Sequence, residues 1–375
     1  MAKPGRQNRY DRPGASLLVA DSTVGEYYCG LARPSPPAPP ASLPIMLPRR
    51  LSLLPLLAVV ALVVGTPAAA SEYRESDDFA VAVNAACSYA ESYGPANTWL
   101  VIDIDNTLLA MEGDLGSDQW FEWQEYLLKH EPDSPHLVAD DFSGLLDAQD
   151  LLFTLGKMRP PQDNLPELVR MVQDRGIKTL VLTSRGPSFR PATERDLKAA
   201  GYDSLTFMPK LTGVPTGEYL PYDAAVPESA GLSAAEMRLY ELSPEPRPAS
   251  LINGVFMTSG QHKGAMLLTA IHRAETKPKA VVFVDDHGRH VQRVYDAMLR
   301  RDIDVTVVHY KREDATVARF RYGDKRDVTE KWRRLESALT EVFNLPPAAA
   351  RPHDTETGGK AHATADAGAD TPASR

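Results

Sequence analysis

The sequence is poor in cysteine, with only Cys29 and Cys87 among 375 residues. Two cysteines cannot build a disulfide framework, and neither belongs to a CxxC pair that would indicate a zinc site. The HExxH pattern of zinc proteases is absent as well. We therefore expect no zinc chemistry, and we expect Cys87 to be a small buried residue.

Basic charge is also scarce, because the formal net charge is −9 and no basic patch with interleaved aromatic residues occurs. This composition disfavours nucleic acid as a partner. The longest apolar run follows Arg49 and Arg50 and has about 15 residues, whereas a membrane-spanning helix needs about 20. Together with Met46 and the small residues that end at Ala70, it predicts a signal peptide at 46–70, a periplasmic or secreted protein, and no stable membrane span after cleavage.

The limits of the folding part follow from composition. Residues 1–45 contain the stretch PSPPAPPAS and no folding pattern, and a signal peptide begins at the true start, so we expect Met46 to be the initiator and 1–45 to be a non-native extension. Residues 346–375 have no large apolar side chain and predict a disordered tail. The predicted catalytic domain is 75–345.

Within that domain, short continuous apolar runs alternate with helical patterns. The runs predict strands at 98–104, 178–184, 204–208, 280–285 and 303–309. Helices are predicted at 77–93, 164–175, 191–200, 262–275, 288–301 and 327–344. Strands that alternate with helices predict an α/β fold with a Rossmann-like, doubly wound parallel sheet.

Two stretches do not follow this alternation. Residues 110–160 contain the aromatic helix 118–130 and a second helical stretch at 138–156, which predicts a small helical cap inserted into the domain. Residues 210–260 are rich in Pro, Gly and Tyr and end in the strand-like LINGVFM. We expect Trp120, Phe121 and Trp123 to pack the cap onto the core rather than to line a substrate site.

Polar side chains stand where three of the predicted strands end. They are Asp103 and Asp105, then Thr183, Ser184 and Arg185, then Asp285 and Asp286. The carboxyl ends of parallel strands meet at one edge of a sheet, where ligands bind. Two carboxylates 4 Å apart repel by about 4 kcal/mol at an effective dielectric constant near 20, so four of them need cations. An oxygen-only ligand set favours Mg²⁺.

Lys263 is the predicted second cation. It begins a predicted helix, where a positive charge opposes the helix dipole, so its placement indicates a role beyond structure. Its ammonium can hold a nucleophilic carboxylate and a bound phosphoryl group. Thr183 or Ser184 can donate a hydroxyl and a backbone N–H to phosphate oxygens, although simple helix capping would leave the same sequence signal.

These residues occur in the order of a known set of motifs. DIDNT at 103–107, TS at 183–184, Lys263 and DD at 285–286 together resemble the haloacid dehalogenase superfamily of phosphatases. The segments DQWFEWQ and NGVFMTSGQHKG resemble a little-characterised bacterial branch of that superfamily, with a domain of unknown function and no known substrate. The resemblance implies a Mg²⁺-dependent phosphomonoester hydrolase that acts on a small phosphorylated substrate.

The resemblance also implies roles for the motif residues. Asp103 would be the nucleophile that forms an aspartyl phosphate, and Asp105 would protonate the leaving group and later activate water. Magnesium would be held by Asp103, by the backbone carbonyl of Asp105, by Asp285 and by Asp286. Thr107 would shape the turn that carries Asp105. Arg185 lies outside the shared motifs, and we expect it to hold the substrate phosphate.

Alternatives remain open. The same motifs serve a phosphotransferase, and a non-catalytic phosphate- or metal-binding envelope protein would retain the same crevice. His287 and His290 lie one helical turn apart and are interpreted as a solvated helix face rather than as metal ligands. Neither the substrate nor the oligomeric state is indicated by the sequence.

Overall fold

The computed structural model describes residues 71–202, 207–208 and 211–343. The predicted extension at 1–45, the signal peptide at 46–70 and the tail at 346–375 lie outside these residues. The described part of the chain forms two compact units, which are treated one at a time.

The first unit comprises residues 71–108, 160–187 and 201–312 and is built on an eight-stranded sheet. Its strands are β1 (Glu72–Ser76), β2 (Thr98–Ile102), β5 (Lys178–Thr183), β6 (Glu218–Tyr219), β7 (Ala249–Ile252), β8 (Val255–Met257), β9 (Ala280–Asp285) and β10 (Asp304–Tyr310). Their order is β1-β10-β9-β2-β5-β8-β7-β6, and all neighbours are parallel except in the β8-β7 and β7-β6 pairs. A mixed α/β fold with a mostly parallel sheet is therefore confirmed.

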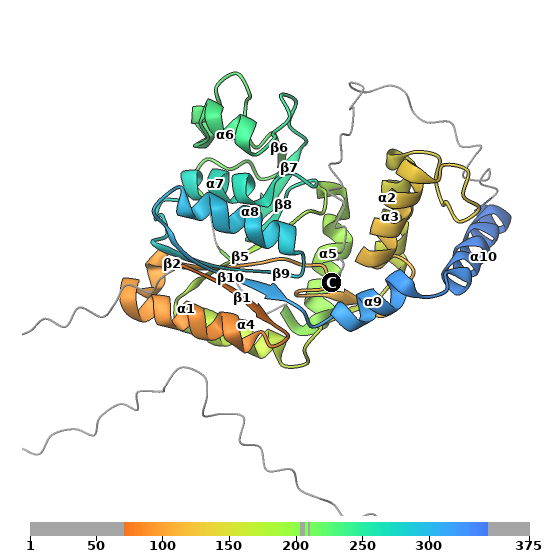
Figure 1. Ribbon diagram of the computed structural model, residues 1–375, viewed down its shortest axis with the longest axis horizontal. Coiled ribbons are helices and arrows are strands. Elements are labelled where there is room, and N and C mark those ends of the chain that lie inside the picture. The colour runs from red at the N-terminus through yellow and green to blue at the C-terminus, as the bar shows by residue number, and fades with distance from the viewer. Residues whose placement is uncertain (1–70, 203–206, 209–210, 344–375) are drawn as a thin grey trace, which may run out of the picture. The chain divides into compact units, whose positions relative to one another are not determined.

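Helices cover both faces of this sheet (Figure 1). Helices α1 (Ala80–Tyr93) and α4 (Leu165–Asp174) lie on one face, and α7 (Lys263–Arg273) and α8 (Gly288–Leu299) lie on the other. Every residue of β2 and β9 is buried, as the continuous apolar runs predicted. Trp99, Phe256 and Phe283 belong to the core cluster that includes α7 and α8, and burial of each such side chain contributes about 1.5–3 kcal/mol.

The strand order reverses beside β2. From β2 the sheet continues through β5 to β8 on one side, while β9 and β10 lie on the other side. In an open parallel sheet such a reversal leaves a crevice at the carboxyl ends of the two strands that flank it. The ends of β2 and β9 are therefore where a ligand site is expected.

The strand predicted at 204–208 falls mostly outside the described residues. Residues 203–206 lie outside the described part, and Phe207 and Met208 belong to no strand, although the Met208 N–H donates to the Thr179 carbonyl at 2.6 Å. On the side away from β2, β5 pairs with β8. LINGVFM, expected as one strand, folds as the β7–β8 hairpin because Asn253 and Gly254 turn the chain with φ values of 53° and 74°. An Asn-Gly pair is the usual sequence of such a two-residue turn.

The second unit comprises residues 109–159, 188–200 and, within the described part, 313–343. Its elements are β3 (Ala110–Met111), α2 (Asp118–His130), α3 (Phe142–Leu155), β4 (Met158–Arg159), α5 (Arg190–Leu197), α9 (Asp314–Tyr322) and α10 (Arg326–Phe343). The predicted insert at 110–160 is thus joined by helices from two later segments, which the sequence pattern did not assign to it. Its role as a cap stays a prediction.

Aromatic side chains pack against one another within this unit. Trp120 is buried, with its ring 6.4 Å from that of Trp332, and the rings of Trp123 and Phe320 lie 5.9 Å apart. Helix α3 begins at 142 rather than at 138, because the Asp141 carboxylate accepts a hydrogen bond from the Gly144 N–H and caps the helix there.

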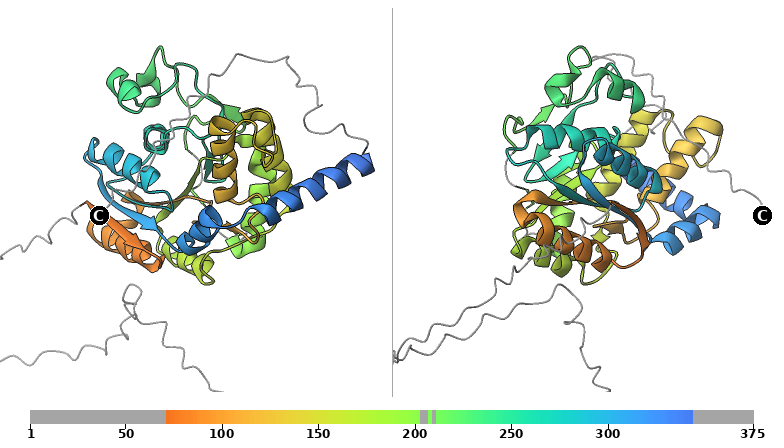
Figure 2. Two further views of the ribbon diagram at one scale, coloured as in Figure 1. Left: turned by 45° about the vertical axis from the view of Figure 1, so that its right-hand side comes forward. Right: turned by 60° about the vertical axis from the view of Figure 1, so that its left-hand side comes forward.

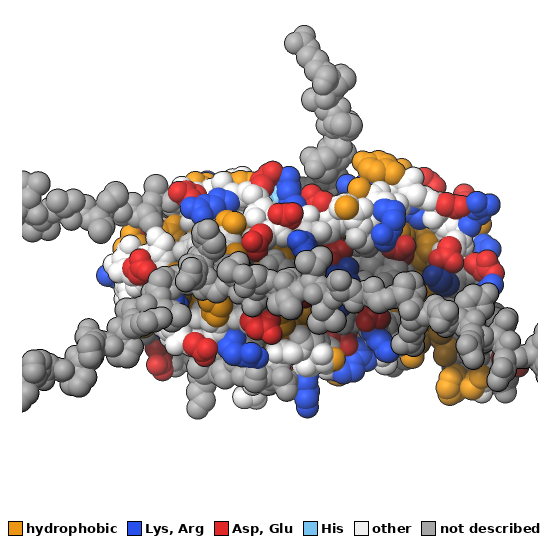
Figure 3. Space-filling view, turned by 90° about the horizontal axis from the view of Figure 1, so that it is seen from below, with side chains coloured by type: hydrophobic (Ala, Val, Ile, Leu, Met, Phe, Trp, Pro, Cys, Tyr) orange, Lys and Arg blue, Asp and Glu red, His pale blue; other side chains and the backbone are white. Residues whose placement is uncertain are grey.

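The described surface mixes charges of both signs. Figure 3 shows Asp and Glu side chains interspersed with Lys and Arg on the face drawn. A short helix, α6 (Ala234–Leu239), lies in the segment between β6 and β7.

Within the described residues, none of the helices has the length and apolar character needed to cross a bilayer. The views of Figure 2 show the same elements from two further directions.

Candidate active site

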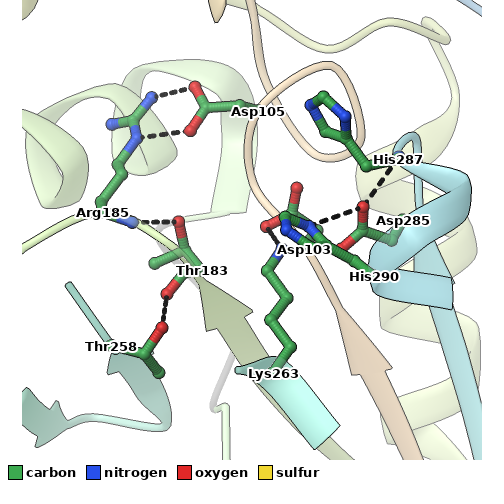
Figure 4. A network of polar contacts seen from close by, with 9 residues as sticks. All are labelled: Asp103, Asp105, Thr183, Arg185, Thr258, Lys263, Asp285, His287 and His290. Atoms are coloured by element: carbon green, nitrogen blue, oxygen red, sulfur yellow. Dashed lines mark hydrogen bonds and ion pairs between the residues drawn. The ribbon is translucent and has the colours of Figure 1, made fainter. Parts of the chain in front are cut away.

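The predicted site residues of the first unit gather where β2, β5 and β9 end (Figure 4). Asp103 follows β2, Thr183 ends β5 and Asp285 ends β9. Ile102 is in register with Val181 on one side and with Val284 on the other, so the three strands end within two residues of one another. The convergence expected from the sequence is present between β2 and β9.

Lys263 bridges two of these carboxylates. Its Nζ lies 2.5 Å from Oδ1 of Asp103 and 2.6 Å from Oδ2 of Asp285, and all three side chains are at most 5% exposed. Burial alone would lower the pKa of Lys263, but Asp103 and Asp285 outweigh burial and raise it. The ammonium therefore remains charged at the first turn of α7, because two carboxylates offset the unfavourable helix dipole.

The loop before α7 fixes this lysine against the end of β5. The backbone N–H groups of residues 258–260 donate to the carbonyl oxygens of residues 183–185, with N···O distances of 2.7 to 3.1 Å. Ser259 and Gly260 have φ values of 53° and 69°, which turn the chain into the helix. His262 then caps α7, since its Nδ1 accepts a hydrogen bond from the Ala265 N–H at 3.1 Å. The position of Lys263 is thus determined by backbone bonds between two loops.

Three carboxylates are close enough together that they could hold a cation. Asp103, Asp285 and Asp286 each offer an oxygen, and these oxygens lie within 4.8 Å of one another. An all-carboxylate donor set suits a hard cation such as Mg²⁺. The predicted contribution of the Asp105 backbone carbonyl stays a prediction.

The buried carboxylates of the cluster are only partly neutralised by Lys263, so an added cation would be favourable. Burial raises the pKa of Asp103 to about 7; Lys263 opposes this shift, and Asp285 and Asp105 add to it. Burial also disfavours ionisation of Asp285, but Lys263 and then His290 lower its pKa below the ordinary value. One ammonium therefore cannot stabilise both carboxylates fully, and a divalent cation beside Asp103 would favour its ionised form.

Asp105 and Arg185 are paired with each other. Nη2 of Arg185 lies 2.7 Å from Oδ1 of Asp105, and Nε lies 2.9 Å from Oδ2. The arginine side chain is 3% exposed and that of Asp105 is 17% exposed. Figure 4 shows the Asp105 carboxylate directed at the guanidinium, away from Lys263. Sequence reasoning placed both residues at this site but missed the pair, although each follows the end of one of two adjacent strands.

This pair changes the charge balance expected from the sequence. Four carboxylates, at positions 103, 105, 285 and 286, face one lysine and one arginine, which leaves two formal negative charges in the cluster. One divalent cation would neutralise them. The sequence-based balance had counted a divalent metal and the lysine but not the arginine.

Thr183 and Ser184 differ in their surroundings. The Thr183 side chain is buried, and its Oγ1 accepts a hydrogen bond from the Arg185 N–H at 3.1 Å, so it shapes the turn after β5. Ser184 is half-buried. This bond closes a turn and caps no helix, because α5 begins only at Arg190 after Phe189. Phosphate binding by either residue stays a prediction.

The turn after β2 is held by its backbone. The N–H groups of Thr107 and Leu108 donate to the Ile104 carbonyl at 3.1 and 2.9 Å, and Asn106 has a φ of 54°. The Thr107 hydroxyl is buried and makes no hydrogen bond with the described residues. Its expected part in shaping the turn is therefore carried by its N–H.

His290 is a site residue that sequence reasoning missed. Its Nδ1 lies 3.4 Å from Oδ1 of Asp285, and its side chain is 12% exposed, so the interpretation as a solvated face was wrong for this residue. Burial and the nearby Lys263 lower its pKa to about 4. The His287 N–H donates to the same oxygen at 2.8 Å. The HxxH spacing directly after Asp285 and Asp286 was the available signal.

Comparison with known proteins gives a family but no activity. A search of curated proteins found no match to this chain. The model of one family matches residues 79–343, a span that runs from α1 to α10 and contains every site residue named above. The chain belongs to this family, which is described as "Protein of unknown function (DUF2608)".

Proposed function

We propose that the protein is a Mg²⁺-dependent hydrolase of phosphomonoesters, of the haloacid dehalogenase type, with a Rossmann-like core. The observation that carries the proposal is the buried Lys263 ammonium, which lies between Asp103 and Asp285 at the reversal of the strand order. Asp286 completes a set of three carboxylates beside it. A nucleophilic carboxylate, a fixed ammonium and a cation site are what phosphoryl transfer through an aspartyl phosphate requires.

Asp103 is the better nucleophile of the two buried carboxylates. Both oxygens of Asp285 are engaged, Oδ2 by Lys263 and Oδ1 by the His287 N–H. Asp103 binds Lys263 through Oδ1 alone, and its Oδ2 accepts no hydrogen bond from the described residues. Oδ2 is therefore the oxygen that can attack phosphorus.

The reaction would proceed in two displacements. In the first, a carboxylate oxygen of Asp103 forms a bond to phosphorus, the bond from phosphorus to the ester oxygen breaks, and Asp105 gives its proton to the departing alkoxide. In the second, Asp105 takes a proton from water, the water oxygen bonds to phosphorus, and the acyl phosphate bond to Asp103 breaks to release phosphate. Lys263 holds Asp103 throughout. Magnesium, held by Asp103, Asp285 and Asp286, would supply charge neutralisation for the phosphoryl oxygens.

A phosphate- or metal-binding protein without turnover is the second candidate. It is favoured by one observation, the Arg185 guanidinium that occupies both oxygens of Asp105. A phosphotransferase would use the same residues with an acceptor other than water. Both alternatives are separated from the hydrolase by the experiment below.

The test is the hydrolysis of an aryl phosphate by the full-length protein with and without Mg²⁺. We compare the wild type with Asp103→Asn and with Asp133→Asn, a control that removes an exposed carboxylate from the second unit. Metal-dependent release that is lost only in Asp103→Asn supports the hydrolase, and a phosphoryl adduct on the peptide that contains Asp103 identifies the intermediate. Phosphate binding without release supports the binding protein, and release that increases with an added alcohol acceptor supports the transferase.

A further inference from the structure

The pairing of Arg185 with Asp105 conflicts with the chemistry proposed for Asp105. To serve the leaving group and then water, that carboxylate needs at least one oxygen directed at the phosphoryl group. In the structure both oxygens are bound by the guanidinium at 2.7 and 2.9 Å, and the side chain is directed away from Lys263 (Figure 4). Asp105 is thus held in a resting position.

Arg185 is fixed to the site by more than its side chain. Its backbone N–H donates to the Thr183 hydroxyl at 3.1 Å, and its carbonyl accepts from the Ser259 N–H at 3.1 Å. The side chain is 3% exposed, so the guanidinium has little freedom to leave the site. Asp105 is the more exposed partner, at 17%, and is the one that can move.

A phosphoryl dianion is a natural competitor for this guanidinium. The planar fork of arginine binds two oxygens of either a carboxylate or a phosphate, and the phosphate carries the larger charge. The fork stands one residue beyond the threonine and serine expected to bind the phosphoryl oxygens. A phosphoryl group in this crevice therefore meets a cation that is already occupied by Asp105.

We propose that Arg185 is a positioning residue that exchanges partners when substrate binds. In the free protein it holds Asp105 aside; the phosphoryl group of the substrate then replaces Asp105 on the guanidinium and releases the carboxylate toward the leaving group. One ion pair replaces another, and no covalent bond changes in this step. The inference rests on the proposed function, because the exchange requires a phosphoryl ligand that binds Arg185 in place of Asp105.

The exchange makes a prediction about binding that does not depend on turnover. If Asp105 competes with phosphate for Arg185, then Asp105→Asn, which removes the competing charge and keeps the side-chain shape, tightens the binding of inorganic phosphate. We expect about a tenfold decrease in Kd, which corresponds to one competing ion pair of ordinary strength. A purely structural salt bridge would predict unchanged or weaker binding.

The experiment is calorimetric titration of the full-length protein with inorganic phosphate, with and without Mg²⁺, for the wild type, Asp105→Asn and Arg185→Lys. Tighter binding in Asp105→Asn and weaker binding in Arg185→Lys support the exchange; unchanged or weaker binding in Asp105→Asn overturns it. If Asp105→Asn does not fold, Asp105→Ser takes its place: tighter phosphate binding supports the exchange, and unchanged or weaker binding overturns it.

The same variants separate this inference from the proposed function. Steady-state hydrolysis by Arg185→Lys should show a raised KM together with a lowered kcat, because the variant affects both phosphate binding and the release of Asp105. If the phosphate affinities shift as expected but no variant hydrolyses an ester, the exchange stands and the hydrolase is rejected. If hydrolysis is observed and the affinities do not shift, the exchange alone fails.

Discussion

Nζ of Lys263 lies 2.5 Å from Oδ1 of Asp103, although 160 positions separate the two residues in the chain. The same ammonium binds Asp285, 22 positions further along the chain. The residue after β2, the last residue of β9 and the first residue of α7 thus place one buried cation between two buried carboxylates. This arrangement should affect the stability of the protein, its binding of a metal ion and the packing of the helices around it.

Replacement of Lys263 by Met should strongly destabilise the protein in the absence of Mg²⁺. Loss of one partner from a buried ion pair leaves uncompensated charge and costs about 3–5 kcal/mol. Denaturant unfolding of the wild type and the variant measures the loss. The double variant Lys263→Met with Asp103→Asn should recover part of it, because one of the stranded carboxylates is then neutral. Additive losses would mean that the two side chains do not interact.

Magnesium should stabilise the wild-type protein and not the variants that lack its ligands. A ligand at a hundredfold its Kd adds about 2.7 kcal/mol to the free energy of unfolding, which appears as a rise in Tm. We expect the rise to disappear in Asp285→Asn and to shrink in Asp286→Asn. Asp302→Asn, which changes an exposed carboxylate in the same unit, is the matched control and should keep it. Equal responses in all four proteins would place the cation elsewhere.

Gly264→Ala should destabilise the contact between α7 and α8. A Cβ at this position would lie 2.3 Å from the Arg293 carbonyl oxygen, so the helices must separate or the lysine beside it must shift. Overpacking of this kind costs about 1–3 kcal/mol. Gly217→Ala has no atom within 4 Å of the added carbon and serves as the control. Chemical denaturation should distinguish the two variants, and equal stability would show that the helices adjust freely.

The stability of the protein should fall as the pH drops below about 6.5, in part through His262. Burial, and then Arg293, lower the pKa of its imidazole to about 3 from an ordinary 6.5. The unfolded chain therefore binds a proton in the window where the folded chain does not, so the contribution is complete above the unfolded pKa and is lost as the pH falls toward the folded one. The slope is at most about 1.4 kcal/mol per pH unit.

His262→Asn tests this assignment because asparagine also caps helices and does not titrate. Between pH 7.5 and pH 5 the wild type should lose about 2 kcal/mol more unfolding free energy than this variant. His130→Asn, which changes an exposed histidine, should behave like the wild type. A pH dependence that persists unchanged in His262→Asn would assign the effect to other groups, among them His290.

The sequence by itself determined the sheet strands at β2, β5, β9 and β10 and the acidic residues at their ends. Continuous apolar runs are local features, and the rule that parallel strands end at a common edge then brings Asp103 and Asp285 together without any knowledge of the packing. Lys263 was identified in the same way, from a cation in an unfavourable place on a helix.

The tertiary structure alone decided which side chains became partners. Arg185 binds Asp105, the half-buried His290 lies against Asp285, and β8 pairs with β5. Each outcome depends on which elements, distant in sequence, pack together and exclude water. A charged group that loses its water is stable only beside an opposite charge, so packing determines the pairs. A linear pattern records which groups are charged, and only the packed fold determines which of them lose their water.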